Sequence, residues 1–156
     1  MSQVSFMDFK GKADGPHFSN ESKEAKKAHV VVLCAKLKEG KTRLSKDTGS
    51  EFAKDISCAM LLDIMVNVSS LPHSTDFILY YAPPESRDEA VVFLKTLGES
   101  AADRWTLLPM PSQNDEDLRS SQLSFKLSYA LNKMSLLYNA ITFIGSDCPT
   151  LHTNGM

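Results

Sequence analysis

Several cationic side chains follow a short apolar run near residue 30, and their arrangement suits an anionic ligand. The run Val30 to Leu33 stops at a loop that carries Lys36, Lys38, Lys41 and Arg43. Short β-branched runs that end in polar loops are typical of buried strands in parallel sheets, whose carboxyl ends bind ligands. Because arginine can donate to two phosphate oxygens and lysine supplies a mobile charge, we interpret the loop as a nucleotide-phosphate loop. The alternative is a solvated surface loop, since the chain contains neither GxxxxGK[ST] nor GxGxxG.

A second candidate group, Asp147, comes directly after the apolar run Ile141 to Gly145. A carboxylate that follows a buried strand could bind Mg²⁺ or Mn²⁺ bridging nucleotide phosphates, because these hard cations prefer oxygen ligands. The alternative is that Asp147 caps the segment after the strand, with Pro149 fixing the turn. The neighbouring Cys148 has no positioned histidine, and we interpret it as a bystander thiol.

The cysteines, histidines and overall charge exclude several other classes. Three cysteines without a CxxC pair favour buried free thiols over a disulfide framework, and the four histidines lack zinc-site spacing. A net charge of −2 gives no electrostatic reason to expect nucleic acid as a partner. No apolar run approaches the length needed to cross a membrane, and the first residues lack a signal-peptide core. The expected location is therefore cytoplasmic.

The elements that position these groups alternate between strand and helix. The polar residues 1–27 are predicted to form a disordered N-terminal arm, and 28–156 a single nucleotide-binding domain. Strands are predicted at 29–35, 76–82, 105–108 and 141–145, each separated by a helix.

The helices are predicted from apolar residues at three- and four-residue steps. After a turn at 48–50, the first stripe comprises Phe52, Ile56, Ala59, Leu62 and Val66. The second stripe comprises Ala90, Leu94 and Leu97, with Gly98 as the stop signal. The third helix is predicted at 118–137.

This alternation predicts an α/β fold of three layers around a mostly parallel sheet. The expected strand order is 3-2-1-4, with the switch point between the first and fourth strands. The cationic loop and Asp147 should then face each other across one crevice.

Four motifs that follow the four predicted strands carry a family resemblance. They are AKLKEGKTRL, YAPPE, the Leu-Leu-Pro end of the third strand, and IGSDCPTL. Their order over residues 29–151 resembles small GT-A-type glycosyltransferases with the nucleotide-diphospho-sugar transferase fold, some of them named for arsenosugar biosynthesis. The K-[ST]-R-L loop is similar to that of the related phospholactate guanylyltransferases.

The resemblance implies a role for specific residues. Five would lie along the nucleotide and its phosphates: Ala35, Lys36, Lys41, Arg43 and Asp117. Asp147 would match the metal-binding aspartate, with Mg²⁺ or Mn²⁺ as the cofactor. The chain departs from the family in a shorter cationic loop and in the absence of the glycines that usually open the third helix, where only Asp117 and Leu118 are retained.

The implied function is that of a glycosyltransferase-like protein that binds a nucleotide-sugar through the cationic loop and a divalent metal. One alternative is a nucleotidyltransferase, in which the same loop holds a triphosphate. The other is a truncated, non-catalytic remnant, because family members continue with further strands and helices past the GSD[CS]P motif. An unpaired edge at the fourth strand would also favour self-association.

Overall fold

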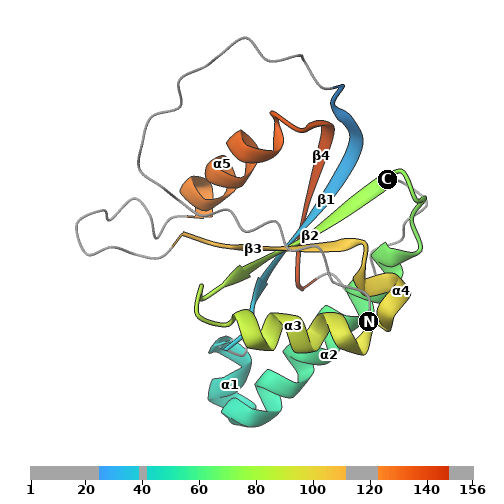
Figure 1. Ribbon diagram of the computed structural model, residues 1–156. Helices are drawn as coiled ribbons and strands as arrows, with labels where there is room; N and C mark the ends of the chain where they lie inside the picture. Colours follow the sequence, from blue (N-terminus) through green and yellow to red (C-terminus); the bar gives the residue numbers. More distant parts are fainter. Residues whose placement is uncertain (1–24, 39–41, 112–122, 148–156) are drawn as a thin grey trace.

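Four parallel strands form one sheet, and helices cover both of its faces (Figure 1). The computed structural model describes residues 25–38, 42–111 and 123–147. The strands are β1 (Lys27–Lys36), β2 (Thr75–Ala82), β3 (Trp105–Pro109) and β4 (Tyr138–Gly145). They are ordered β3-β2-β1-β4, so the predicted α/β class and strand order are confirmed.

The helices connect the strands as crossovers on opposite faces. They are α1 (Thr42–Thr48), α2 (Ser50–Ser69), α3 (Arg87–Thr96), α4 (Glu99–Ala102) and α5 (Leu123–Met134). Figure 1 shows α2, α3 and α4 on one side of the sheet and α5 on the other. The short helices α1 and α4 were not predicted. No helix within the described ranges combines the length and apolar character needed to span a membrane.

The core has two layers because alternate residues of a strand point to opposite faces of the sheet. Val31 and Leu33 of β1 pack in the cluster that contains the buried residues of α2 and α3. Val30 and Val32 pack in the cluster that contains the buried residues of α5. All four of these β1 residues are fully buried, as expected for an internal strand of the sheet.

The predicted apolar stripe of α2 is wrong. Phe52 and Val66 are 55% and 60% exposed. The buried residues are instead Ala53, Leu61, Ile64, Met65 and Val68, and the last four pack in the cluster that contains β1. Both sets recur at three- and four-residue steps, because this helix has apolar residues on more than one side, and periodicity alone does not choose between them.

The prediction for α3 is confirmed in its main features. Ala90 and Leu94 are buried, and Leu97 packs partly against the same cluster. Gly98 follows with a φ of 85°. This left-handed conformation favours glycine, which explains why the helix ends at that point.

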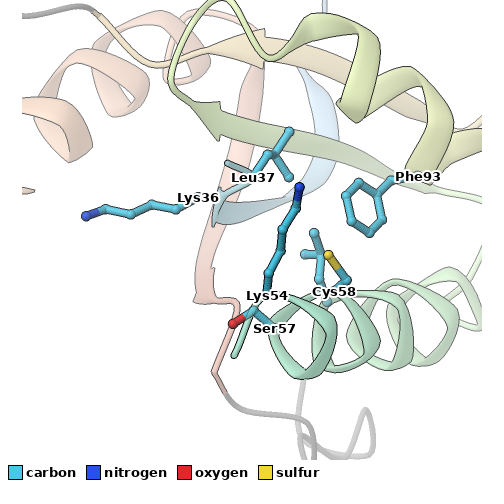
Figure 2. Close-up of a pocket in the computed structure, with 7 residues that line it drawn as sticks. Lys36, Leu37, Lys54, Ser57, Cys58 and Phe93 are labelled. Atoms are coloured by element: carbon cyan, nitrogen blue, oxygen red, sulfur yellow. The ribbon is translucent and has the colours of Figure 1, made fainter. Parts of the chain in front are cut away.

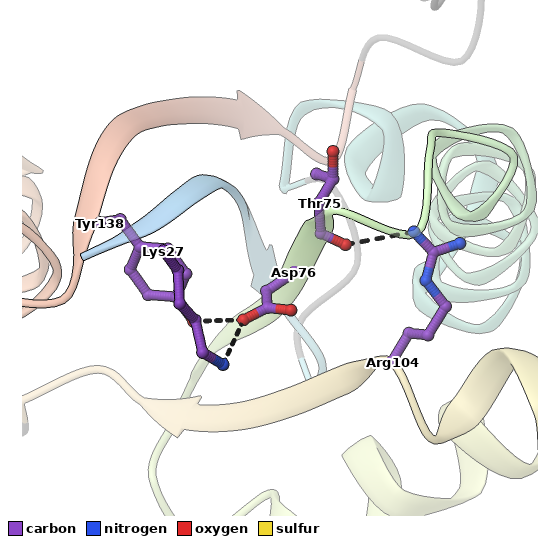
Figure 3. A network of polar contacts seen from close by, with 5 residues as sticks. All are labelled: Lys27, Thr75, Asp76, Arg104 and Tyr138. Carbon is purple, nitrogen blue, oxygen red and sulfur yellow. Dashed lines mark hydrogen bonds and ion pairs between the residues drawn. The ribbon is translucent and has the colours of Figure 1, made fainter. Parts of the chain in front are cut away.

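A polar network joins the amino ends of three strands (Figure 3). The Asp76 carboxylate of β2 accepts a hydrogen bond from Lys27 Nζ of β1 at 2.7 Å and from Tyr138 Oη of β4 at 2.8 Å. These residues lie at or next to the first residue of each strand. The network therefore aligns the sheet at the end opposite the carboxyl ends of the strands.

Arg104 connects the end of α2 to the start of β2. Its guanidinium donates to the carbonyl oxygens of four residues at 2.7 to 3.1 Å: Ser69, Leu71, Pro72 and Thr75. The last carbonyl groups of a helix have no partner within the helix, so a cation at this position satisfies them. The guanidinium also lies 4.5 Å from the ring centre of Phe77.

Candidate functional site

The strand order creates a switch point at β1. The chain passes from β1 to β2 and β3 on one side of the sheet and then returns to β4 on the other side. The two crossovers next to this point lie on opposite faces of the sheet, outside the carboxyl ends of β1 and β4. Ligands of open α/β sheets bind at such switch points. The candidate site is therefore the corner where these two strands end.

Lys36 is the last residue of β1 and Asp147 follows the end of β4, so both lie at this corner. In the parallel pairing of β1 with β4, Cys34 is the register partner of Gly145. Lys36 and Asp147 each follow two residues later, so they leave the sheet from adjacent strands at the same level. Both side chains are exposed. Lys36 and Asp147 therefore lie at the ends of adjacent strands, and their joint use with the rest of the cationic loop as one ligand site stays a prediction.

Both side chains lie on the face of the sheet that α5 covers. Cys34 packs against the α5 cluster, and Lys36 is two residues further along the same strand. The Asp147 carboxylate lies where a side chain of Gly145 would begin, with Oδ1 2.8 Å from an ideal Cβ position. Because Gly145 shares its face with Cys34, the carboxylate is on the α5 side as well.

Gly145 is a positioning residue that the sequence prediction missed. A real Cβ atom essentially never lies 2.8 Å from another heavy atom, so any other residue at this position would displace the carboxylate. The available signal was a glycine at the end of an apolar run, two residues before an aspartate. Glycine in a strand often marks a place where another group approaches the backbone closely.

A small hollow lies beside the end of β1 on the opposite face, under α2 and α3 (Figure 2). It is lined by Lys36, Leu37, Lys54, Ser57, Cys58, Leu61 and Phe93. Its volume of about 10 Å³ holds about one water molecule. Figure 2 shows the side chain of Lys36 extending away from the other lining residues. The hollow is therefore too small for a nucleotide, and the charged end of Lys36 points away from it.

Two free thiols lie near the site, and both are protonated at neutral pH. Burial raises the pKa of Cys34 to about 11. Burial also raises the pKa of Cys58, although Lys54 acts in the opposite direction. A thiol with a raised pKa is a poor nucleophile. Neither cysteine has the character of a catalytic group.

The remaining predicted ligand residues either face the opposite side of the sheet or have side chains outside the described part of the structure. Ala35 is buried in the cluster with α2 and α3, so its side chain faces away from the α5 side. Arg43 lies in the first turn of α1, and its side chain is outside the described part of the structure. Lys41, Asp117 and Cys148 also lie outside the described residues.

The donor groups around Asp147 bear on the predicted divalent metal ion. Within the described ranges, no three His, Cys, Asp or Glu side chains lie close enough together to hold a metal ion. Asp147 contributes one exposed carboxylate at the candidate corner. Mg²⁺ commonly binds through one or two carboxylates, with substrate phosphates and water as the other ligands. Among the described residues, the single carboxylate of Asp147 is thus compatible with an ion that shares a nucleotide's phosphates, and the metal stays a prediction.

Comparisons with known proteins give a structural match. No family model matches the chain, and no curated protein matches it in sequence. The structure is similar to that of a putative nucleotide-diphospho-sugar transferase from Desulfovibrio desulfuricans G20, with a TM-score of 0.60 and 19% identity. The match covers 80% of this chain and 49% of the other, so this chain corresponds to about half of that protein. The similarity shows the fold.

Proposed function

We propose that this protein binds the diphosphate group of a nucleotide-sugar at the corner between β1 and β4 and acts in glycosyl transfer. One observation carries the proposal: adjacent strands deliver Lys36 and Asp147 to the same face at the switch point of the sheet. The fold shared with a nucleotide-diphospho-sugar transferase supports the choice of ligand. No residue in the described ranges suggests a competing covalent mechanism.

In this proposal the Lys36 ammonium group and the Asp147 carboxylate bind different parts of the ligand. The ammonium group of Lys36, the last residue of β1, binds phosphate oxygens as a point charge. The Asp147 carboxylate, held over Gly145, provides an oxygen ligand for Mg²⁺ or Mn²⁺ bound together with the nucleotide. The cationic segment that continues to Lys41 and Arg43 would add further phosphate contacts.

The chemistry requires charge compensation. In glycosyl transfer, an acceptor oxygen bonds to the sugar's anomeric carbon and gives up its proton. The bond between that carbon and the diphosphate oxygen breaks, and its electron pair leaves with the diphosphate. Groups already positioned around that oxygen stabilise the developing charge at little reorganisation cost. A divalent ion at Asp147 would supply part of this stabilisation. Lys36, on the neighbouring strand, would supply the rest from the protein.

The test is a panel of ligands in a thermal-unfolding assay of the protein. A ligand that binds only the folded state raises the melting temperature with its concentration. UDP- or GDP-sugars with Mn²⁺ should stabilise the protein, and nucleoside triphosphates should do so less. Stronger stabilisation by triphosphates would indicate nucleotidyl transfer instead. No shift with any nucleotide would contradict the proposal and leave the non-catalytic alternative.

Substitutions of Lys36 and Lys54 test which face of the sheet binds the nucleotide. Lys36→Ala should weaken nucleotide binding roughly ten- to a hundred-fold, as expected when a charge-assisted hydrogen bond is lost. Lys54→Ala is the matched control, because Lys54 lies beside the hollow on the other face. A larger effect of Lys54→Ala would place the ligand on the α2 side and contradict the proposal.

A further inference from the structure

Four carbonyl oxygens at the junction of α2 and β2 form a cage around the guanidinium group of Arg104. Three of them surround Nη2: those of Leu71 at 3.0 Å, Pro72 at 2.7 Å and Thr75 at 3.1 Å. The fourth, that of Ser69, lies 2.8 Å from Nη1. Figure 3 shows the guanidinium beside the Thr75 carbonyl group. We call these four acceptors the carbonyl cage, and it holds a cation through neutral oxygens.

An aromatic ring completes the site. Cζ of Arg104 lies over the ring of Phe77, 4.5 Å from its centre. Phe77 is fully buried, and its ring centre lies 5.1 Å from that of Trp105, so its position is fixed by packing. A guanidinium group is attracted to the face of an aromatic ring. The cage and the ring together therefore suit a planar cation that offers hydrogen-bond donors from more than one nitrogen.

Contacts that do not involve the Arg104 side chain hold the carbonyl cage in shape. The backbone N–H of Thr75 donates to the carbonyl oxygen of Pro72 at 2.9 Å, which closes the turn. The indole N–H of Trp105 donates to Ser69 Oγ at 3.0 Å, which fixes the end of α2. The last carbonyl groups of a helix also lie at the negative end of its dipole. The cage should therefore keep its shape and its attraction for a cation when the Arg104 side chain is shortened.

We propose that the carbonyl cage is a binding site for a guanidinium-type cation, which Arg104 fills as an intramolecular ligand, and that it binds a free alkylguanidinium ion when this side chain is removed. A spherical cation such as K⁺ could contact the three oxygens around the Nη2 position. It could not reach the Ser69 oxygen and the Phe77 ring at the same time, so the site should prefer the planar ion. This site lies at the amino end of the sheet, so the inference does not depend on the proposed function.

Chemical rescue of the full-length Arg104→Ala variant tests the proposal. The probe is N-ethylguanidinium, which replaces the atoms of the arginine side chain beyond Cβ. Trp105 is the single tryptophan of the chain and lies beside the cage, so its fluorescence reports binding. The signal should saturate with a dissociation constant on the order of 10 mM. At about 50 mM the probe should raise the melting temperature of the variant by roughly 2–5 °C relative to NaCl at equal ionic strength.

The wild type and a second lysine variant are the controls. In the wild type Arg104 already fills the cage, so N-ethylguanidinium should give neither a saturable fluorescence change nor a rise in melting temperature. Lys95→Ala removes a cation at the end of α3 and should behave like the wild type. An equal response of the wild type and Arg104→Ala would overturn the proposal. An equal rise of the Arg104→Ala melting temperature with KCl or NH₄Cl would overturn the preference for a planar ion.

Arg104→Lys gives a further test, because it retains a cation beside the cage. N-ethylguanidinium must compete with the lysine ammonium group and should bind at least about five-fold more weakly than to Arg104→Ala. Equal affinity for the two variants would mean that the probe binds elsewhere and would overturn the proposal. If circular dichroism shows that Arg104→Ala is unfolded alone, about 100 mM N-ethylguanidinium should restore the folded spectrum. A spectrum that stays unfolded would also overturn the proposal.

Discussion

The carboxylate of Asp147 lies directly over the backbone of Gly145, with Oδ1 2.8 Å from the point where a Cβ would be attached. This contact turns the carboxylate back toward the end of β4 on the same face as Lys36. A loop carboxylate would otherwise sample many directions, and fixing one direction reduces the entropy lost on binding a ligand.

Gly145→Ala should therefore impair the site without unfolding the protein. The new methyl group displaces a flexible side chain rather than the backbone, so the melting temperature should change little. Nucleotide binding in the presence of Mn²⁺ should weaken by about three- to ten-fold, a cost of roughly 1 kcal/mol. Calorimetric titration gives the affinity, and Ser146→Ala is the control in the same turn. Equal binding by Gly145→Ala and the wild type would mean that the carboxylate's position is irrelevant.

Two adjacent residues of α2, Met65 and Val66, test which face of this helix is buried against the sheet. Met65 is fully buried against the sheet, whereas its neighbour Val66 is mostly exposed. Met65→Ala should lower the free energy of unfolding by about 2–4 kcal/mol, because it leaves a cavity. Val66→Ala should change it by less than about 0.5 kcal/mol. Urea titration measures both. A larger loss of unfolding free energy for Val66→Ala than for Met65→Ala would mean that the stripe with Phe52 and Val66 faces the core.

Arg104 is the expected stability determinant at the amino end of the sheet. Arg104→Ala leaves four carbonyl groups at the α2–β2 junction without their donor. Because the site is partly exposed and water replaces some of these bonds, we expect a loss of about 2–4 kcal/mol. Thermal unfolding should show this loss as a clear drop in melting temperature. Arg104→Lys should recover only part of it, since one ammonium group cannot reach all four acceptors. Lys95→Ala, an exposed substitution at the end of α3, is the control.

The buried thiol of Cys34 predicts how stability changes with pH. Burial raises its pKa from 9.0 to about 11 in the folded state. Between these values the unfolded chain loses the proton and the folded chain keeps it, so stability falls as the pH rises from about 9 to 11. The expected loss is about 1–3 kcal/mol, and burial of Tyr80 and Tyr138 raises their pKa values and adds to the same trend.

The variant Cys34→Val isolates this contribution. Urea titrations at pH 8 and pH 10.5 should show a smaller loss of stability for Cys34→Val than for the wild type. Burial continues to raise the pKa values of Tyr80 and Tyr138 in both proteins, while Cys34→Val also removes the smaller contribution of Cys34 to the Tyr80 pKa. If the two proteins lose the same stability over this range, the Cys34 thiol does not cause the effect.

The sheet could be predicted because its strands are dense in branched and aromatic residues. Strand order then followed from alternation with helices, and it placed Lys36 and Asp147 at one corner. β4 begins at Tyr138, three residues before the predicted start at Ile141, because the exposed Asn139 and Ala140 carry no strand signal. The sequence predicts a loop where α1 forms, because polar residues dominate this segment. Periodicity does not encode two features: the buried side of α2, which depends on tertiary packing, and the local fold of the Asp147 side chain back over Gly145.

The measurement that tests the central claim most directly is a titration of Mn²⁺ followed by electron paramagnetic resonance, with and without a nucleoside diphosphate. The signal of free Mn²⁺ should persist with the protein alone, because one carboxylate does not hold the ion. Adding UDP or GDP should reduce that signal beyond what the nucleotide does without protein. The effect should disappear in Asp147→Asn and weaken in Lys36→Ala. If wild type and Asp147→Asn retain the same amount of Mn²⁺ with nucleotide, the β1–β4 corner is not the binding site.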